Sequence, residues 1–219
     1  RLPDDIQSIP DGAFDGCESL TEVNMPTAIT EIGMSAFYNC KSLTDITIPQ
    51  SVAKIGWNAF DGTALIDKHP DGLVIVDGCL LSYKGECPEK VIIPDGVRLI
   101  CSAFNHCENL VSVSIPGSVK GIDAYAFAEC HKLAEVMISE GVTRIGDSSF
   151  NNCYALNQLS IPTSVIEIEK WAFAGAHLES IEIPYGVKYI GSSAFRVCSN
   201  MTDISLPSSV VSIGDYAFD

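Results

Sequence analysis

The chain has 219 residues, of which 47% are hydrophobic, so it is long enough to bury a substantial core. Acidic residues outnumber lysine and arginine 28 to 13, which gives a formal net charge of −15. Such a surface repels phosphate backbones and anionic membranes, so the composition disfavours binding to nucleic acid or to a membrane surface. No apolar run approaches the roughly 20 residues that a membrane-spanning helix needs, and no signal peptide stands at Arg1.

A repeat of about 23 residues runs along the chain. Consecutive repeat phenylalanines are 23, 23, 44, 23, 23, 23, 22 and 23 residues apart, and alanine precedes eight of the nine. They are Phe14, Phe37, Phe60, Phe104, Phe127, Phe150, Phe173, Phe195 and Phe218. A step this constant predicts an array of stacked coils, because a unit this small buries its apolar face only against its neighbours.

Each unit is predicted to contain two extended pieces and a turn. In "LTDITIP" (43–49) apolar residues alternate with polar ones, which predicts a short strand that proline ends. A second short extended piece follows and ends at an isoleucine that glycine often follows. The apolar spacing over 32–40 then predicts a short helical turn. Gly16 and Asn39 suit a left-handed residue at its end.

The step of 44 contains an irregular repeat over residues 61–102. Its apolar runs are separated by Asp77-Gly78 and by the string "GECPE". Because Asp-Gly between apolar runs is a signal for a two-residue turn, we predict a β-hairpin of Leu73–Val76 and Cys79–Tyr83. We favour a repeat variant that flattens or projects one coil over a hairpin that contacts a partner.

Six cysteines share the column three residues after phenylalanine, where two other units have Thr63 and Ala176. They are Cys17, Cys40, Cys107, Cys130, Cys153 and Cys198. Equivalent side chains of stacked coils point the same way, with Cβ atoms about 5 Å apart, beyond the usual disulfide range of about 3.5–4.5 Å. We therefore predict a structural ladder of buried free thiols, in preference to an inter-coil disulfide or to zinc, whose ligands must converge.

One further pair of cysteines lies in the irregular repeat. If residues 79–84 are extended, Cys79 and Cys87 lie about 20 Å apart. We predict no bond between them. Since the total of nine cysteines is odd, at least one thiol lacks an intramolecular partner.

No motif for catalysis, metal binding or a cofactor is present. The nucleophile-elbow, phosphate-loop, zinc-protease and EF-hand patterns are all missing from the sequence. The four histidines are interpreted as solvent-facing, and the Asp-Gly pairs as turns. They are His69, His106, His131 and His177. The sequence therefore predicts no enzyme, no metal site and no cofactor.

The repeat as a whole resembles a known family. The pattern C-x-x-L-x-x-[IV]-x-I-P-x-x-[VI]-x-x-I-G-x-x-A-F looks like the BspA-like, 23-residue class of leucine-rich repeat, and it covers essentially the whole chain. The resemblance implies a right-handed, curved leucine-rich repeat solenoid with short parallel strands on its inner face. Both ends of the sequence fall within a repeat unit, so we expect residues 1–219 to be a single solenoid and a fragment of a longer array.

The same resemblance implies a non-catalytic, secreted or cell-surface bacterial scaffold that mediates protein or glycan binding or adhesion. One alternative is a structural spacer within a larger surface protein. Another is an intracellular interaction scaffold, which would fit the free thiols because the cytosol keeps cysteine reduced.

Two polar columns of the predicted strand form the candidate binding face. The first contains Glu22, Asp45, Ser112, Glu135, Gln158, Ser180 and Asp203. The second contains Asn24, Thr47, Ser114, Met137, Ser160, Glu182 and Ser205. This acidic and small-polar face either binds a basic partner or is merely solvated. On the outer side, Trp57, Tyr125, Trp171 and Tyr216 either cover the phenylalanine core or form a second binding stripe.

Overall fold

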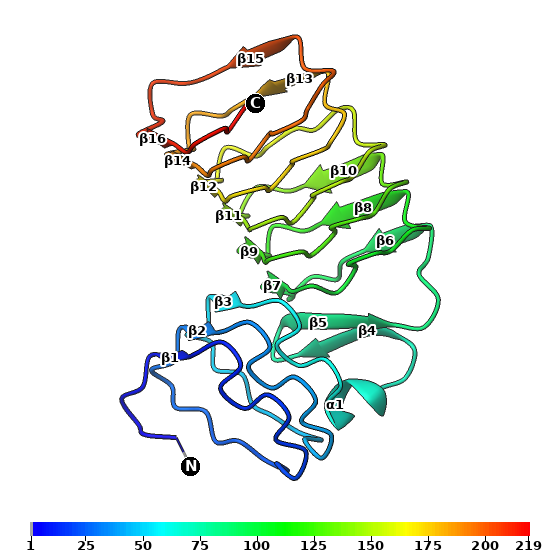
Figure 1. Ribbon diagram of the computed structural model, residues 1–219, viewed down its shortest axis with the longest axis vertical. Helices are drawn as coiled ribbons and strands as arrows, with labels where there is room; N and C mark the ends of the chain where they lie inside the picture. The colour runs from blue at the N-terminus through cyan, green and yellow to red at the C-terminus, as the bar shows by residue number, and fades with distance from the viewer. Residues whose placement is uncertain (1) are drawn as a thin grey trace.

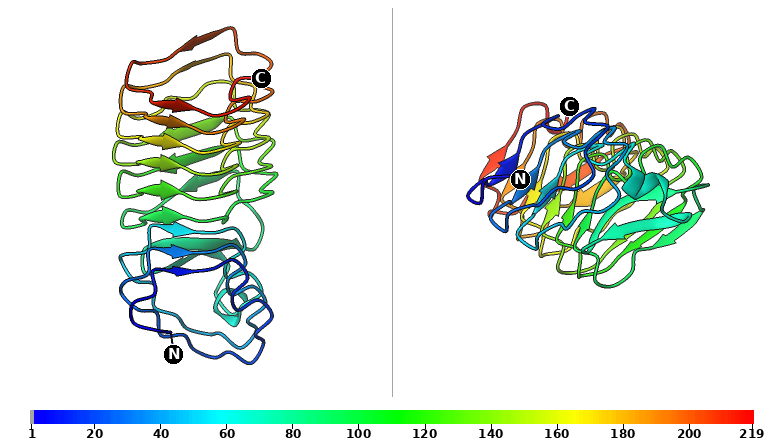
Figure 2. Two further views of the ribbon diagram at one scale, coloured as in Figure 1. Left: turned by 60° about the vertical axis from the view of Figure 1, so that its left-hand side comes forward. Right: turned by 90° about the horizontal axis from the view of Figure 1, so that it is seen from below.

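The computed structural model describes residues 2–219, in which short strands recur once per repeat along a stack of coils (Figure 1). The second extended piece forms a two-residue strand in nine units of this described part. These strands are β1 (Ser8–Ile9), β2 (Glu31–Ile32), β3 (Lys54–Ile55), β7 (Leu99–Ile100), β9 (Gly121–Ile122), β11 (Arg144–Ile145), β12 (Glu167–Ile168), β14 (Tyr189–Ile190) and β16 (Ser212–Ile213). Neighbouring strands are parallel and pair isoleucine with isoleucine, as Ile122 pairs with Ile145. The predicted repeat solenoid with short parallel strands is therefore confirmed (Figure 2).

The first extended piece forms strands in only some units. They are β6 (Lys90–Ile92), β8 (Ser112–Ile115), β10 (Glu135–Ile138), β13 (Ser180–Glu182) and β15 (Asp203–Ser205). Strands β10, β8 and β6 make one sheet, and β13 and β15 make another. The equivalent segments 22–25, 45–48 and 158–161 are not strands, although their sequence pattern predicts them. The longest sheet has eight strands. Six of them are the second extended pieces from β7 to β16, and the other two come from the irregular repeat.

The turn that carries each phenylalanine differs from the predicted helical turn. Residues two positions before and after phenylalanine adopt left-handed backbone angles, as at Ser35 (φ 53°) and Asn39 (φ 56°). The Phe37 N–H donates to the Ala59 carbonyl at 2.8 Å, and the Asn39 N–H donates to the Asp61 carbonyl at 2.8 Å. These bonds to the next coil take the place of helical ones. Within residues 2–219 the one helix is α1 (Ala64–Asp67), in the irregular repeat.

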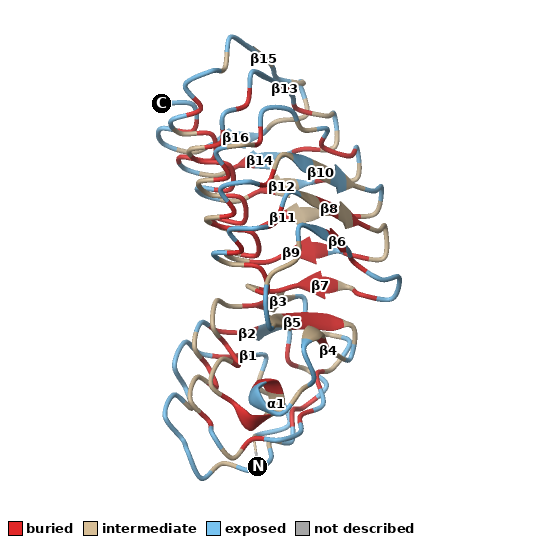
Figure 3. Ribbon diagram, turned by 90° about the vertical axis from the view of Figure 1, so that its right-hand side faces the viewer, coloured by how far each residue is buried: buried red, intermediate tan, exposed pale blue. Residues whose placement is uncertain are grey.

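The phenylalanines form two stacks in the interior, one from Phe14 to Phe60 and one from Phe104 to Phe218. Phe127 is fully buried, and its ring centroid lies 5.2 Å from that of Phe104 and 5.2 Å from that of Phe150. These spacings are within the range of favourable stacked aromatic pairs. In the irregular repeat Tyr83 takes the place of phenylalanine, with its ring centroid 5.6 Å from that of Phe104. Figure 3 shows that the buried residues recur at equivalent places in successive coils.

One residue beside this stack departs from the repeat. Ser149 stands where the other eight units have alanine, and its hydroxyl is buried with no hydrogen-bond partner among the described residues. Ser149→Ala should raise the free energy of unfolding by about 1 kcal/mol, because the desolvated hydroxyl is removed. Urea denaturation measures the change. Ser148→Ala is the control, since the Ser148 hydroxyl donates to Asp147 at 2.9 Å and its loss should give no gain. A Ser149→Ala variant that is less stable than the native chain would contradict this account.

The predicted hairpin is present and joins two parts of the stack. Strands β4 (Gly72–Val76) and β5 (Cys79–Lys84) are antiparallel. Asp77 (φ 47°) and Gly78 (φ 75°) form the two-residue turn between them, with the left-handed angles that such hairpins require. Strand β5 then pairs in parallel with β7 and so begins the regular eight-stranded sheet. We call the coils of β1–β3 the N-terminal stack and those from β5 to β16 the C-terminal stack.

The hairpin forms a wall between two hydrophobic cores. Leu80 belongs to the core of the C-terminal stack, and Leu73 packs against that core. Val74 and Leu81 belong to the core of the N-terminal stack. This division follows from the alternation of side chains along a strand. Since both faces of the hairpin pack against protein, it does not project as an arm for a partner.

Side chains connect the two stacks where strand pairing is interrupted. Strand β3 is the last strand of its sheet, and its Ile55 N–H donates to Asp123 at 3.0 Å. Arg144 donates to the Ala53 carbonyl at 3.0 Å and also to the Asp123 carboxylate. Glu169 accepts from Lys54 at 3.2 Å and from Arg144 at 3.4 Å. We call Lys54, Asp123, Arg144 and Glu169 the junction cluster. Its side chains satisfy backbone groups that a neighbouring strand would otherwise satisfy.

The cysteine column is largely a row of free thiols. Cys40, Cys130, Cys153 and Cys198 are buried and free, and Cys17 is exposed and free. Each buried thiol of this column donates to the phenylalanine carbonyl of the preceding coil, as Cys130 does to Phe104 at 3.1 Å. Thr63 donates to the Phe60 carbonyl at 2.7 Å instead. Burial raises the pKa of the Cys130 thiol to about 12.

One ladder member corrects the sequence prediction. Cys107 was expected to be free, but it forms a disulfide with Cys87, with a Cα–Cα distance of 5.7 Å. Inter-coil disulfides are disfavoured only between equivalent positions, whose side chains point the same way. Cys87 follows Tyr83 by four residues, whereas Cys107 follows Phe104 by three, so the two side chains are not equivalent. The predicted absence of a Cys79–Cys87 bond is confirmed, since Cys79 is free.

Thiol titration with a disulfide reagent should give a different number of reactive cysteines for the native chain, the unfolded chain and the unfolded chain after reduction. The native chain should react rapidly at one cysteine, because Cys17 alone of the seven free cysteines is exposed. Burial of the other six keeps them protonated and inaccessible. The unfolded chain should react at seven cysteines, and at nine after reduction. Nine reactive thiols without reduction would show that Cys87 and Cys107 are not bonded.

Candidate binding site

Strand register places the predicted binding residues in aligned rows. Ser112 lies opposite Glu135, and Ser114 lies opposite Met137. In the same way Ser180 and Glu182 lie opposite Asp203 and Ser205. Gln158 and Ser160 are exposed, but they belong to a segment that is not a strand. The rows are thus continuous within each sheet and interrupted between β10 and β13.

The structure adds two residues to these rows that the sequence analysis did not assign. Lys90 lies opposite Ser112, and Ile92 lies opposite Ser114, because β6 pairs with β8. Ile92 is 66% exposed and Met137 is 63% exposed, so two apolar side chains flank Ser114. The face of β6, β8 and β10 is therefore less polar than predicted. The sequence places a strand at Val91–Ile93, but the polar columns were counted from each phenylalanine, and this coil has Tyr83 in that place.

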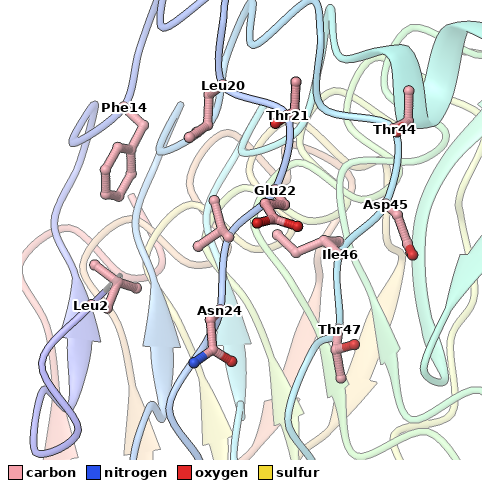
Figure 4. Close-up of a pocket in the computed structure, with 11 residues that line it drawn as sticks. Leu2, Phe14, Leu20, Thr21, Glu22, Asn24, Thr44, Asp45, Ile46 and Thr47 are labelled. Carbon is pink, nitrogen blue, oxygen red and sulfur yellow. The ribbon is translucent and has the colours of Figure 1, made fainter.

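The four remaining predicted residues line a hollow of about 830 Å³ in the N-terminal stack. Glu22 and Asn24 come from one coil, and Asp45 and Thr47 from the next, and the two segments run side by side (Figure 4). The lining also includes the apolar side chains of Leu2, Phe14, Leu20, Val23 and Ile46. We call this feature the N-terminal slot. It combines polar walls with access to part of the repeat core.

A second hollow, of about 560 Å³, lies at the junction of the two stacks. Its lining includes Val52 and Ala53 of the N-terminal stack and Arg98, Lys120 and Arg144 of the C-terminal stack. These basic groups are already engaged, since Arg98 donates to the Pro49 carbonyl at 3.0 Å and Lys120 to the Gly117 carbonyl at 3.2 Å. The hollow is therefore better explained as part of the connection between the stacks than as an anion site.

The aromatic residues of the outer side contact neighbouring side chains, although Trp171 is 37% exposed and Tyr216 is 69% exposed. The rings of Trp57 and Tyr125 lie 5.3 Å apart. The guanidinium of Arg196 lies 5.5 Å from the Trp171 ring and 5.9 Å from the Tyr216 ring. Such cation–π contacts engage one face of each ring. The alternative of an aromatic binding stripe stays a prediction.

The histidines of the described residues contact neighbouring side chains, as His131 does. His131 bonds to Glu129 at 2.9 Å and stacks on Tyr154 with ring centroids 4.9 Å apart. Within residues 2–219 no three histidine, cysteine or acidic side chains gather in a way that could hold a metal ion. Over the same range no helix has the length and apolar character to cross a membrane.

These features define a leucine-rich repeat solenoid with polar rows on its coils. The model of the BspA type leucine rich repeat region matches in six copies, over residues 1–69, 82–195 and 120–219. The chain belongs to this family.

Solved structures agree with this assignment. The chain is 31% identical to a leucine rich cell surface protein from Faecalibacterium prausnitzii, with a TM-score of 0.58, over 93% of this chain and 58% of that one. It thus spans less than two thirds of that relative's length. A leucine-rich repeat protein from Eubacterium ventriosum has the same fold, with 18% identity, a TM-score of 0.56 and coverage of 97% and 80%. No curated protein matches the chain.

Proposed function

We propose that this chain is a non-catalytic binding scaffold of a secreted or cell-surface bacterial protein. Its ligand would be a protein or glycan, and it would bind through the exposed rows of the first extended piece. The observation that carries the proposal is the register that aligns exposed side chains of successive coils, such as Ser112 with Glu135. Solenoid proteins bind through such aligned surfaces.

Two observations support a location outside the cytosol. The relative from Faecalibacterium prausnitzii is a cell surface protein. The Cys87–Cys107 disulfide is of a kind that persists in oxidising environments and is rare in the cytosol. The disulfide favours the surface scaffold over an intracellular one, even though seven cysteines are free. Burial of six of them protects them from oxidation.

The proposed ligand is basic. The rows carry Glu22, Asp45, Glu135, Glu182 and Asp203, against Lys90 as the one lysine that the described strands add to them. Complementary charge mainly increases the rate of association and gives specificity, and it weakens as salt rises. A basic protein should therefore bind with an affinity that falls between low and high ionic strength.

A panel of immobilised basic proteins, neutral proteins and glycans tests this function. The native chain is compared with the triple variant Glu22→Gln, Asp45→Asn, Glu135→Gln, which should bind the basic proteins more weakly. The matched control neutralises three exposed acidic residues elsewhere: Asp15→Asn, Glu108→Gln and Asp215→Asn. Equal weakening by both triple variants would show only a general charge effect. Absence of binding to every member of the panel would favour the spacer module instead.

A further inference from the structure

Exposed apolar side chains gather around strand β8. Ile92 on β6 is 66% exposed, Met137 on β10 is 63% exposed, and Val111, which directly precedes β8, is 38% exposed. Single exposed apolar residues are common on protein surfaces, but several around one strand are typical of an interaction site. These three strands lie within the C-terminal stack, with further coils of the chain on both sides (Figure 1), so the exposure does not arise from an open end of the stack.

Strand register places two of these side chains on either side of a small one. Ile92 lies opposite Ser114, and Ser114 lies opposite Met137. Because neighbouring strands are about 4.8 Å apart, Ile92 and Met137 are separated by about 9.6 Å across Ser114. A flat ring standing over Ser114 would thus lie about 4–5 Å from the side chain on each side, close to van der Waals contact. We call Ile92, Ser114 and Met137 the β8 patch.

The chemistry of the β8 patch favours an aromatic occupant with a polar tip. The thioether of Met137 makes favourable contacts with aromatic rings at about 5 Å. Ser112 and Ser114 are half-buried on the same face of β8, and their hydroxyls can both donate and accept a hydrogen bond. Tyrosine combines a ring with a hydroxyl, and it is one of the residue types that contribute most to protein interfaces.

Charges of opposite sign flank the next row of the same face. Lys90 lies opposite Ser112 on one side, and Glu135 lies opposite it on the other. Both charged side chains are exposed. A basic group beside the bound ring would therefore be attracted towards Glu135 and repelled from Lys90. The net charge of −15 also favours the approach of a basic partner.

We propose that the β8 patch binds a tyrosine of a partner protein that carries a basic residue next to it. The ring would lie over Ser114 between Ile92 and Met137, and the basic group would face Glu135. An apolar centre with a charged rim is the usual arrangement of a protein–protein interface. This inference rests on the proposed binding function, and it adds the anchoring contact and a protein as the class of ligand.

The peptide acetyl-Arg-Tyr-Gly-amide is the probe, titrated into the chain labelled with ¹³C-methyl methionine. The methyl signal of Met137 should move upfield as the ring docks against it. The methyl signal of Met34, which is 44% exposed and lies outside the β8 patch, should stay in place. Methyl shifts report affinities in the millimolar range, which is what a single anchoring side chain provides. Acetyl-Arg-Val-Gly-amide at equal concentration should not reverse the shift, because it has no ring.

A pair of serine variants tests where the ring binds. Ser114→Leu fills the space over which the ring would lie, so it should weaken binding of the tyrosine peptide at least about tenfold. Ser180→Leu is the matched control, since Ser180 is also on a strand of the first extended piece but belongs to a different sheet. It should leave the affinity unchanged. Thermal unfolding of both variants establishes that they are folded.

A pair of charge variants tests the place of the basic group. Glu135→Gln should weaken binding of the tyrosine peptide several-fold at low ionic strength, because the carboxylate that faces the arginine is lost. Lys90→Gln should not weaken binding, because it removes a like charge. Equal weakening by both variants would contradict the predicted orientation.

The outcomes separate this inference from the proposed function. If the peptide does not shift Met137, or if Ser114→Leu binds it as well as the native chain does, the β8 patch is not the site. Full reversal of the shift by the valine peptide would also overturn the inference. If the panel of basic proteins and glycans yields a ligand that Ser114→Leu binds unchanged, the binding scaffold stands and the β8 patch is wrong. If the peptide binds at the patch although the panel yields no ligand, this inference stands and the proposed ligand class is wrong.

Discussion

Phe127→Ala should lower the free energy of unfolding by about 3–5 kcal/mol. The Phe127 side chain is fully buried, and its ring stacks between Phe104 and Phe150 at 5.2 Å from each. Truncation leaves a cavity that touches two neighbouring coils, and in a solenoid the interfaces between neighbours supply much of the stability. The decrease in the free energy of unfolding is therefore expected to be close to that measured when a large core residue of a compact domain is replaced by alanine.

Urea denaturation followed by tryptophan fluorescence measures this loss. The two tryptophans report on different parts, since Trp57 lies beside β3 in the N-terminal stack and Trp171 lies beside β12 in the C-terminal stack. Cys130→Ala is the control, because alanine already occupies the equivalent position as Ala176 and the thiol makes only a weak bond to Phe104. It should cost about 1 kcal/mol or less. Equal losses for Phe127→Ala and Cys130→Ala would contradict the assignment of the cysteine column to packing.

The repeat period and the core were predictable because they depend on short-range pattern. Every phenylalanine of the period stacks on a neighbour of the period, from Phe14 on Phe37 to Phe195 on Phe218. The hairpin was predictable for the same reason, since Asp77-Gly78 specifies its own turn. The phenylalanine stacking and the hairpin turn are both specified by residues close together in the sequence or one repeat apart. Predicting them therefore required no knowledge of contacts between distant parts of the chain.

The connection between the stacks was not predictable from the sequence. Asp123 and Ile55 are 68 positions apart, and Lys54 and Glu169 are 115 apart. These pairs meet because the irregular repeat displaces the N-terminal stack, and no periodic pattern encodes that displacement. A signal was nevertheless present: Asp123 stands where Gly33, Gly56, Gly146, Gly191 and Gly214 stand in other units. At Gly146 a Cβ atom would lie 2.5 Å from the Ile122 carbonyl oxygen, so a side chain there would require that coil to shift.

The alignment of the candidate binding rows was predictable from the sequence, but the shape of the surface that they form was not. The rows of polar residues follow from the alternation along a strand, and Ser112 and Glu135 lie side by side as that alternation predicts. The N-terminal slot was not predictable, because segments 21–25 and 44–47 have the same pattern as segments that pair. Whether neighbouring coils pair depends on their separation along the stack, which the pattern of one coil does not contain.

Asp123→Ala should lower the free energy of unfolding by about 3–5 kcal/mol, the second large effect that we expect. The Asp123 side chain is 0% exposed, and burial raises the pKa of its carboxyl while the Arg144 guanidinium opposes that rise. Removing the carboxylate leaves the Ile55 N–H and a largely buried guanidinium without their main partner. Breaking a buried ion pair on one side costs more than the pair itself contributes, because the remaining charge stays desolvated.

The Arg196–Asp219 pair supplies a matched control for this prediction. Its side chains are 40% and 53% exposed, so Asp219→Ala should cost no more than about 1 kcal/mol. The double variant Asp123→Ala, Arg144→Met should be more stable than Asp123→Ala alone, because no buried charge then lacks a partner. Limited proteolysis should show earlier cleavage within residues 2–60 in Asp123→Ala, since the junction cluster holds the edge of β3.

Two results would contradict this view of the junction. If Asp123→Ala costs no more than Asp219→Ala, the junction cluster contributes little and the hairpin wall alone holds the stacks together. If the double variant has a lower free energy of unfolding than Asp123→Ala, the unpaired guanidinium is not the main cost. Arg144 would then stabilise the junction through its bond to the Ala53 carbonyl and its contact with Glu169. In either case the N-terminal stack should still unfold before the C-terminal stack, because its first extended pieces are unpaired while β8 and β10 are paired.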